Sequence, residues 1–144
     1  MSISDIKLLE KLDKKKEYLI KEAEDFTNNY MHTGLTHSQI NLILGIANEA
    51  TSIKEVINFL RYQIARDEKS RNWEKKNIGK NLIKKLREIY EEPKSEGDLD
   101  DQQKNELGME MVRYFLGYFS RESRYWYWEL KNKKEGKDES GDSR

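Results

Sequence analysis

Apolar residues recur three and four positions apart through most of this chain, which is the spacing of amphipathic helices. Over residues 4–30 the apolar stripe consists of Leu9, Leu12, Leu19, Ala23, Phe26 and Tyr30, and Lys16 interrupts it. The chain holds one proline and shows little apolar–polar alternation, which leaves little room for strands. These patterns predict an all-α, single-domain bundle of about five helices with a long aromatic C-terminal helix.

Two helix starts are encoded by side chains that cap backbone N–H groups. Thr36 is the expected N-cap of one helix, and Gln39 completes a capping box with it. Ser52 and Glu55 repeat this pattern for the next helix. The expected buried faces of the two helices are Ile40, Ile43, Leu44 and Ala47, followed by Ile53, Val56, Ile57, Leu60 and Ile64.

The rest of the chain divides into two further helices, an acidic stretch and a tail. We expect the third helix to run through Arg66 and to fray over residues 70–77. A fourth helix over residues 78–90 buries an apolar side made of Ile78, Leu82, Ile83, Leu86 and Ile89. Residues 91–105 contain Pro93 and Gly97 and are expected to form an exposed acidic loop. The last helix spans residues 101–131, which predicts a helical domain over residues 1–131 and a disordered charged tail over residues 132–144.

Residues 61–87 concentrate positive charge in a chain whose formal net charge is zero. They hold ten lysines and arginines against three acidic residues, roughly +7 by this count. The compensating acid lies chiefly in Glu91, Glu92, Glu96, Asp98, Asp100, Asp101 and Glu106. This segregation indicates one positive surface, and phosphate backbones are the commonest partner of such a surface. A solvated, lysine-rich helix face explains the same charges without any ligand.

Composition excludes several classes of protein. The chain has no cysteine, which rules out disulfides and thiolate zinc sites and suits a reducing compartment. No apolar run reaches the roughly 20 residues that span a bilayer, and the N-terminus lacks the apolar core of a signal peptide. We expect a cytoplasmic protein that makes no contact with membranes.

Catalytic and metal-binding motifs find no support. His32 and His37 are the only histidines, and neither has a neighbouring pattern of metal ligands. The sequence contains no Ser-His-Asp arrangement, glycine-rich phosphate loop or HExxH motif. The adjacent acids Glu91 and Glu92 fall in the expected loop, where carboxylates are ordinarily solvated. We therefore predict no enzyme activity, no catalytic residue, no metal and no cofactor.

The last predicted helix is rich in aromatic residues and includes a Tyr-Trp-Tyr-Trp run at residues 125–128. Consecutive helical residues point about 100° apart, so at least two of these rings must face away from the core. Arg113, Arg121 and Arg124 lie among the aromatic residues, which suits base stacking or cation–π contact with nucleic acid. A protein–protein surface explains the same composition, because Tyr, Trp and Arg dominate interface hot spots. We rank the protein interface slightly above base stacking.

Three segments resemble one known family, the small subunit of type III-A (Csm) CRISPR effector complexes. Residues 35–40, Leu-Thr-His-Ser-Gln-Ile, resemble its LTxSQIRxxL helix start, and apolar residues 42–44 continue the match. Residues 60–66, Leu-Arg-Tyr-Gln-Ile-Ala-Arg, resemble its next helix, which ends in a Y-x-x-GR-like stretch. Residues 113–115 and 124–127 are similar to its aromatic, basic last helix. The pattern departs at Asn41, where the family has arginine, at Ala65, where it has glycine, and from Lys131 onward, where it has a glycine-rich end.

The resemblance implies a non-catalytic scaffold in antiviral defence. Such a subunit stacks with copies of itself beside other CRISPR effector subunits and contacts guide RNA and target RNA. Basic residues on rigid helices hold the phosphates, while base pairing supplies sequence specificity. The candidate RNA-binding residues are Arg61, Arg66, Arg71, Lys75, Lys76, Lys80 and Lys84, with Arg121 and Arg124 as weaker candidates. The acidic surfaces are expected to meet basic surfaces of neighbouring subunits.

Three alternatives stay open from the sequence, ahead of an enzyme with an unrecognised fold, which ranks last. The related small subunit of type III-B (Cmr) complexes has the same size and helical class. A helical protein–protein adaptor or homodimer without nucleic acid explains the basic and aromatic residues through an acidic partner. A DNA-binding helix-turn-helix protein is disfavoured, because the apolar faces of the helices over residues 40–65 leave few side chains to read base edges.

Overall fold

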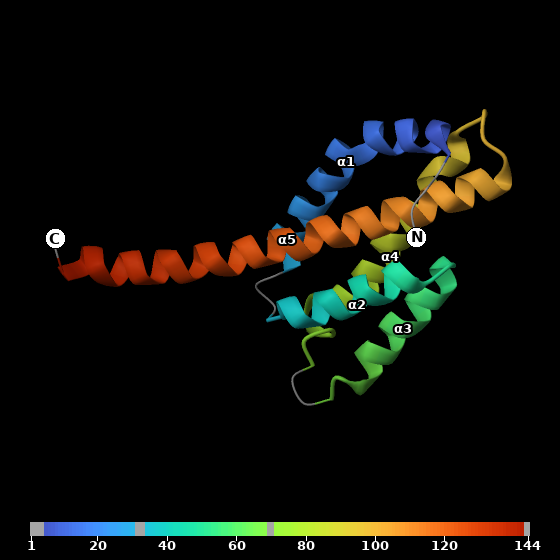
Figure 1. The fold of residues 1–144 in the computed structure, drawn as a ribbon. Helices are drawn as coiled ribbons and strands as arrows, with labels where there is room; N and C mark the ends of the chain where they lie inside the picture. Colours follow the sequence, from blue (N-terminus) through green and yellow to red (C-terminus); the bar gives the residue numbers. More distant parts are fainter. Residues whose placement is uncertain (1–4, 31–33, 69–70, 143–144) are drawn as a thin grey trace.

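The structure is a computed structural model that describes residues 5–30, 34–68 and 71–142, with side chains described through residue 134. The described residues form five α-helices joined by short connections (Figure 1). In chain order these are α1 (Ile6–Tyr30), α2 (His37–Glu49), α3 (Ile53–Arg66), α4 (Ile78–Glu91) and α5 (Asp101–Asp142), with 3₁₀ turns η2 (Lys75–Asn77) and η3 (Glu92–Ser95). The predicted all-α bundle with a long aromatic C-terminal helix is confirmed.

α5 is the axis of the bundle, with α1 on one side of it and α2 and α3 on the other (Figure 1). α1 runs parallel to α5. Near their starts, Gln103 donates a hydrogen bond to Asp5 at 3.2 Å, and further along both helices Lys16 lies 5.7 Å from the ring centroid of Tyr114. The C-terminal part of α5 extends past the ends of the other helices (Figure 1).

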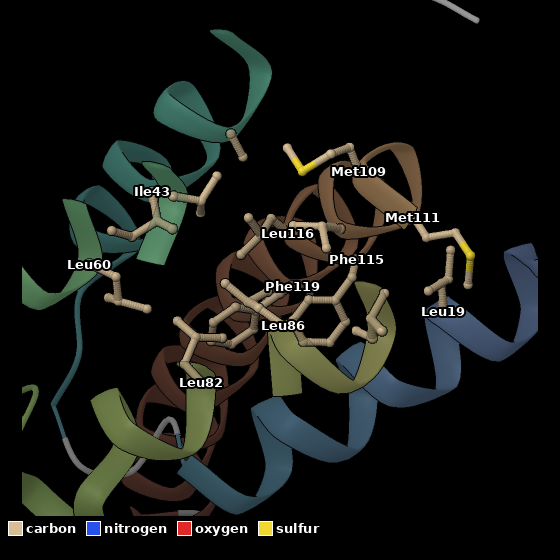
Figure 2. Close-up of a cluster of buried hydrophobic side chains, with 14 of the residues drawn as sticks. Leu19, Ile43, Leu60, Leu82, Leu86, Met109, Met111, Phe115, Leu116 and Phe119 are labelled. Carbon is tan, nitrogen blue, oxygen red and sulfur yellow. The ribbon is translucent and has the colours of Figure 1, made fainter. Parts of the chain in front are cut away.

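Phe115 and Phe119 of α5 form the centre of the core, and both are fully buried. Phe26 of α1 meets their rings edge-on, at centroid distances of 6.2 and 5.2 Å. Figure 2 shows the aliphatic side chains of the other helices that surround this part of α5: Leu19, Ile43, Leu60, Leu82 and Leu86. Burying a side chain of this size contributes about 1.5–3 kcal/mol, so the apolar faces predicted from spacing stabilise the bundle chiefly through α5.

Both predicted helix starts are capped, with the full capping box at α2 and only its Ser52 half at α3. At α2 the Thr36 hydroxyl accepts from the backbone N–H of Gln39 at 3.2 Å, and the Gln39 side chain accepts from the backbone N–H of Thr36 at 3.0 Å. At α3 the Ser52 hydroxyl accepts from the backbone N–H of Glu55 at 3.3 Å. Caps of this kind satisfy donors that a helix start leaves free and are worth about 1 kcal/mol each.

Two glycines permit close approach of neighbouring helices. A Cβ atom on Gly108 of α5 would lie 2.6 Å from the carbonyl oxygen of Tyr90, a backbone atom of α4 that cannot turn aside. A Cβ atom on Gly79 of α4 would lie 2.6 Å from the side chain of Ile64 in α3. α4 therefore packs against α5 at a backbone distance that a larger residue does not allow, and against α3 at a distance that a larger residue reaches only if the Ile64 side chain moves.

The buried stripe of α1 differs from the predicted one by a residue at its start. Leu9 is 44% exposed, whereas Leu8 is fully buried. Both leucines fit a three-four spacing with Leu12, but at 100° per residue Leu8 lies closer to the direction shared by Leu19 and Phe26. The spacing of apolar residues therefore identifies the buried face of α1 only when the angle of each residue around the helix axis is taken into account.

Residues 91–105 are mostly helical rather than an exposed loop. α4 ends at residue 91, the 3₁₀ turn η3 follows directly over residues 92–95, and α5 begins at residue 101. The Asp100 carboxylate accepts from the backbone N–H of Gln103 at 2.8 Å, and the Gln103 side chain accepts from the backbone N–H of Asp100 at 2.9 Å. This reciprocal cap has the same logic as the one at Thr36, and it fixes the start of α5 at residue 101, where the sequence predicts the last helix to begin.

α5 continues as helix to Asp142, whereas the sequence predicts a disordered tail from residue 132. Lysine and glutamate, which recur in this stretch, have high helix propensity. Glu129 also pairs with Lys133 one turn later, at 2.9 Å. Local propensity therefore extends the helix beyond the part that packs on the bundle.

Candidate nucleic-acid interface

The acidic residues that balance the basic segment face lysines of α1. Lys11 Nζ lies 3.1 Å from Glu96 and 3.0 Å from Asp98, and Lys15 Nζ lies 2.5 Å from Glu92. The hydrogen bonds from Lys11 hold the pKa of Glu96 and of Asp98 below their ordinary values. These acids were expected to meet neighbouring subunits, but the structure pairs them within the chain.

The candidate RNA-binding side chains are all exposed on the surface: Arg61, Arg66, Arg71, Lys75, Lys76, Lys80, Lys84, Arg121 and Arg124. Within the described residues, Arg71 is the one member of this set that forms an ion pair, with Glu74 at 3.1 Å. Lys85, which the set omits, is instead held by Glu22 at 2.9 Å and Glu88 at 3.3 Å. Lysines of α1 thus neutralise the acids at residues 92–98, while the candidate cations of α3 and α4 face solvent.

The structure brings some candidate cations together and separates others. One groove, of about 410 Å³, lies between α3 and α4; this α3–α4 groove is lined by Arg61, Ile64, Ala65, Lys80, Ile83 and Arg87. Arg66 lines a separate hollow of about 280 Å³ that also involves α2. Lys84 lines a third, of about 230 Å³, together with three acidic residues of α1 and α4. Those nearby carboxylates make Lys84 the weakest phosphate candidate among the lysines.

Arg87 joins the α3–α4 groove although it was not among the candidate residues. It lies seven residues after Lys80, which places the two side chains about two helical turns apart on the same face of α4. The sequence contains this signal, because Lys80, Lys84 and Arg87 recur at helical spacing.

Trp73 anchors the segment between α3 and α4. Its side chain is only 2% exposed, its backbone N–H donates to Asp67 at 3.2 Å, and its carbonyl accepts from Gly79 at 2.9 Å. The segment therefore holds exposed Lys75 and Lys76 on a fixed support, where the sequence predicts fraying. A lone tryptophan in a polar stretch has no periodicity to identify it as a core residue.

Arg113 is a structural residue rather than a partner of exposed aromatic rings. It is 8% exposed, and its guanidinium donates to the carbonyls of Ala47 and Ala50 at 2.8 and 2.7 Å and to Glu110 at 2.8 Å. Ala50 is the C-cap of α2. The cation therefore satisfies carbonyls at the C-terminus of α2, where a positive charge also complements the helix dipole.

The prediction that at least two rings of the Tyr-Trp-Tyr-Trp run face outward is confirmed. Tyr125 and Trp128 are each 56% exposed and stack on one another, with ring centroids 5.6 Å apart and an interplanar angle of 26°. Trp126 and Tyr127 are half-buried, and the Tyr127 hydroxyl donates to the carbonyl of Leu35. The exposed pair is thus the part of the run that is free to meet another molecule.

His37 has a packing role between α2 and α5. Its Nε2 accepts from the Asn41 side chain at 2.9 Å, and its Nδ1 lies 3.3 Å from the Ser123 hydroxyl. Asn41 in turn accepts from the Ser120 hydroxyl at 2.5 Å. Asn41, where the resembled family has arginine, therefore serves helix packing here. His32 lies outside the described residues.

The part of the chain that the structure describes contains neither a cluster of metal-ligating side chains nor a helix that could span a membrane. Its residues include no group of three or more His, Cys, Asp or Glu side chains placed to hold a metal ion. None of its helices combines the length and the apolar character needed to cross a bilayer.

No protein-family model, curated protein or solved structure matches this chain. Function must therefore be inferred from its exposed basic and aromatic residues.

Proposed function

We propose that this chain is a non-catalytic RNA-binding protein that holds a phosphate backbone on exposed cations of α3, α4 and the segment between them. One observation carries the proposal. Glu92, Glu96 and Asp98 are paired with lysines of α1, while most candidate cations have no ion pair within the described residues. Such cations exchange counterions for phosphates without first breaking a contact inside the protein. Contacts of this kind position an RNA but do not read its sequence.

The strongest phosphate site is the end of the bundle where α2 begins, beside the connection between α3 and α4 (Figure 1). Asn72 donates to Gln39 of α2 at 3.4 Å and accepts from Lys75 Nζ at 3.2 Å. Arg66 lies 5.6 Å from the ring centroid of Tyr62, which is 58% exposed. Cations beside a helix N-terminus and an exposed ring suit a phosphate and its neighbouring base.

As the cellular form of this activity we propose the small subunit of a type III CRISPR effector complex. The support is the resemblance of residues 35–40, 60–66 and 113–115 to the type III-A small subunit. The Thr36 cap is compatible with it, since the resembled motif is a helix start. The proposed partners are guide RNA, target RNA, the other effector subunits and copies of this chain.

RNA binding is tested by fluorescence anisotropy with a labelled single-stranded RNA and with an RNA duplex. The double variant Arg66→Glu/Lys76→Glu is expected to bind at least about tenfold more weakly, because two phosphate contacts become repulsive. Lys14→Glu is the matched control, since Lys14 is exposed on α1 and forms no ion pair within the described residues. Unchanged affinity in a double variant that retains its helicity by circular dichroism would contradict the proposal.

The cellular form is tested by affinity purification of the tagged chain from its native host. Recovery of CRISPR effector subunits with short repeat-tagged guide RNAs supports it and distinguishes type III-A from type III-B. Recovery of RNA without those subunits supports RNA binding but contradicts the effector-complex assignment.

A protein–protein adaptor or homodimer is a second candidate function, favoured by the stacked rings of Tyr125 and Trp128. Both are exposed on the part of α5 that lies beside the start of α2, where the Tyr127 hydroxyl between them donates to the carbonyl of Leu35. Large exposed aromatic side chains are the commonest anchors of protein interfaces. Sedimentation of the wild type and of Tyr125→Ala/Trp128→Ala tests the homodimer, which predicts a dimer that the double variant loses.

A further inference from the structure

The α3–α4 groove combines an apolar floor with a cationic rim. Ile64 and Ile83 form the floor with Ala65, and Arg61, Lys80 and Arg87 surround it. Ile83 is 8% exposed and belongs to the hydrophobic core, so the floor is an opening onto the core between two helices.

The groove is preformed by the packing of α3 and α4. Gly79 seats the side chain of Ile64 at one end, where a Cβ atom would lie 2.6 Å from it. α3 and α4 have 14 residues each, so each is about 21 Å long at 1.5 Å per residue. The lining residues of α4 run from Lys80 to Arg87, about two turns of that helix, so the groove accommodates about two turns of a partner helix.

The rim cations have no acidic partner of their own. Within the described residues Arg61, Lys80 and Arg87 form no ion pair, in contrast to Lys85, which two glutamates hold. Phosphates would use such cations but gain nothing from an aliphatic floor. An acidic peptide with carboxylates beside apolar side chains satisfies both parts of the groove.

We infer that the α3–α4 groove binds an acidic amphipathic helix of a partner protein. The apolar side of that helix packs on Ile64, Ala65 and Ile83, and its glutamates or aspartates pair with Arg61, Lys80 and Arg87. This is the helix-in-groove mode of recognition, with the rim charges selecting an acidic partner and its register. The inference takes Arg61 and Lys80 out of the phosphate-binding cations of the proposed function and leaves Arg66, Lys75 and Lys76 near the start of α2 for phosphates. It therefore does not depend on RNA binding.

The probe is a fluorescein-labelled synthetic peptide, about four helical turns long, with leucines three and four residues apart on one face and glutamates beside them. Binding is measured by anisotropy, and helix formation on binding by circular dichroism. Ala65→Trp is expected to weaken binding at least about tenfold, because the exposed Ala65 position can hold an indole that fills the groove. Arg61→Glu/Arg87→Glu is expected to have a similar effect, whereas Lys14→Glu leaves binding unchanged.

Three results would overturn the inference. One is equal binding of a scrambled peptide of the same composition, which would show that charge alone attracts the probe. Another is full peptide affinity in Ala65→Trp. The last is a result in which the peptide does not bind and both groove variants bind oligouridine RNA more weakly than the wild type does. That result would make the groove part of an RNA-binding surface. Loss of RNA binding in Arg66→Glu/Lys76→Glu has no bearing on these outcomes, so the two proposals fail separately.

Discussion

The guanidinium Nε of Arg113 in α5 donates a hydrogen bond of 2.8 Å to the carbonyl oxygen of Ala47 in α2. A charged side chain of α5 thereby satisfies the C-terminus of a helix that precedes it by more than sixty residues. Arg113→Ala is expected to lower the free energy of unfolding by about 3 kcal/mol, because it leaves buried carbonyls and Glu110 without their donor. Urea denaturation followed by circular dichroism measures this loss.

The matched control for Arg113 is Arg124→Ala on the same helix. Arg124 is exposed and forms no ion pair within the described residues, so its loss is expected to change stability by less than about 0.5 kcal/mol. Equal stability of the two variants would contradict the structural role of Arg113.

Gly108→Ala is expected to destabilise the fold by about 1–3 kcal/mol, because the added Cβ atom would press on the Tyr90 carbonyl and force α4 and α5 apart. Gly117→Ala in the same helix meets no atom within 4 Å of the added carbon. It should instead stabilise the protein by about 0.5–1 kcal/mol through helix propensity. Chemical denaturation of both variants checks the opposite signs, and destabilisation by both would point to a different helix packing.

The Lys11 network predicts a pH dependence of stability. Hydrogen bonds from Lys11 lower the folded-state pKa of Glu96 and Asp98 below their ordinary values of 4.5 and 3.8. Their pairing therefore stabilises the fold above those values and is lost as pH falls through the lower folded-state pKa. The difference in Tm between the wild type and Lys11→Met should be largest near neutral pH and should disappear in acid. The exposed Lys14→Met variant is the control, and a difference that stays constant with pH would contradict the pairing.

The proposed phosphate contacts also predict how RNA affinity depends on salt. Each contact with single-stranded RNA contributes about 0.7 to the slope of log affinity against log salt concentration. Arg66→Glu/Lys76→Glu should reduce the magnitude of this slope by about 1.4 if both cations touch phosphates. Anisotropy titrations at several salt concentrations measure it, and an unchanged slope would place the phosphates elsewhere.

Local chemistry predicts much of this fold from sequence. Thr36 and Ser52 specify helix starts through partners three residues away. The apolar faces of α2, α3 and α4 follow from spacing alone, because nearly every residue in those faces packs on the same neighbour, α5 or the core around it. Spacing alone does not decide whether Leu8 or Leu9 is buried, because they lie four and three residues before Leu12 and both fit a helical repeat.

Long-range pairing is what the sequence could not supply. Lys11 meets Glu96 across 85 residues and Arg113 meets Ala47 across 66. The basic surface was predictable as a charge run, but its division among separate hollows depends on how α3 packs on α4. The recurrence of lysines at positions 7, 11 and 15 was a usable signal, because that spacing places three cations on one face of α1.

The position of α5 in the chain has a consequence for synthesis. Phe115 and Phe119, the centre of the core, leave the ribosome after all four helices that pack around them. Until then the apolar faces of α1 to α4 lack the surface that covers them, and exposed faces of this kind are prone to aggregate. The bundle is therefore expected to fold only after α5 has left the ribosome, and the nascent chain is expected to need holding by chaperones until then.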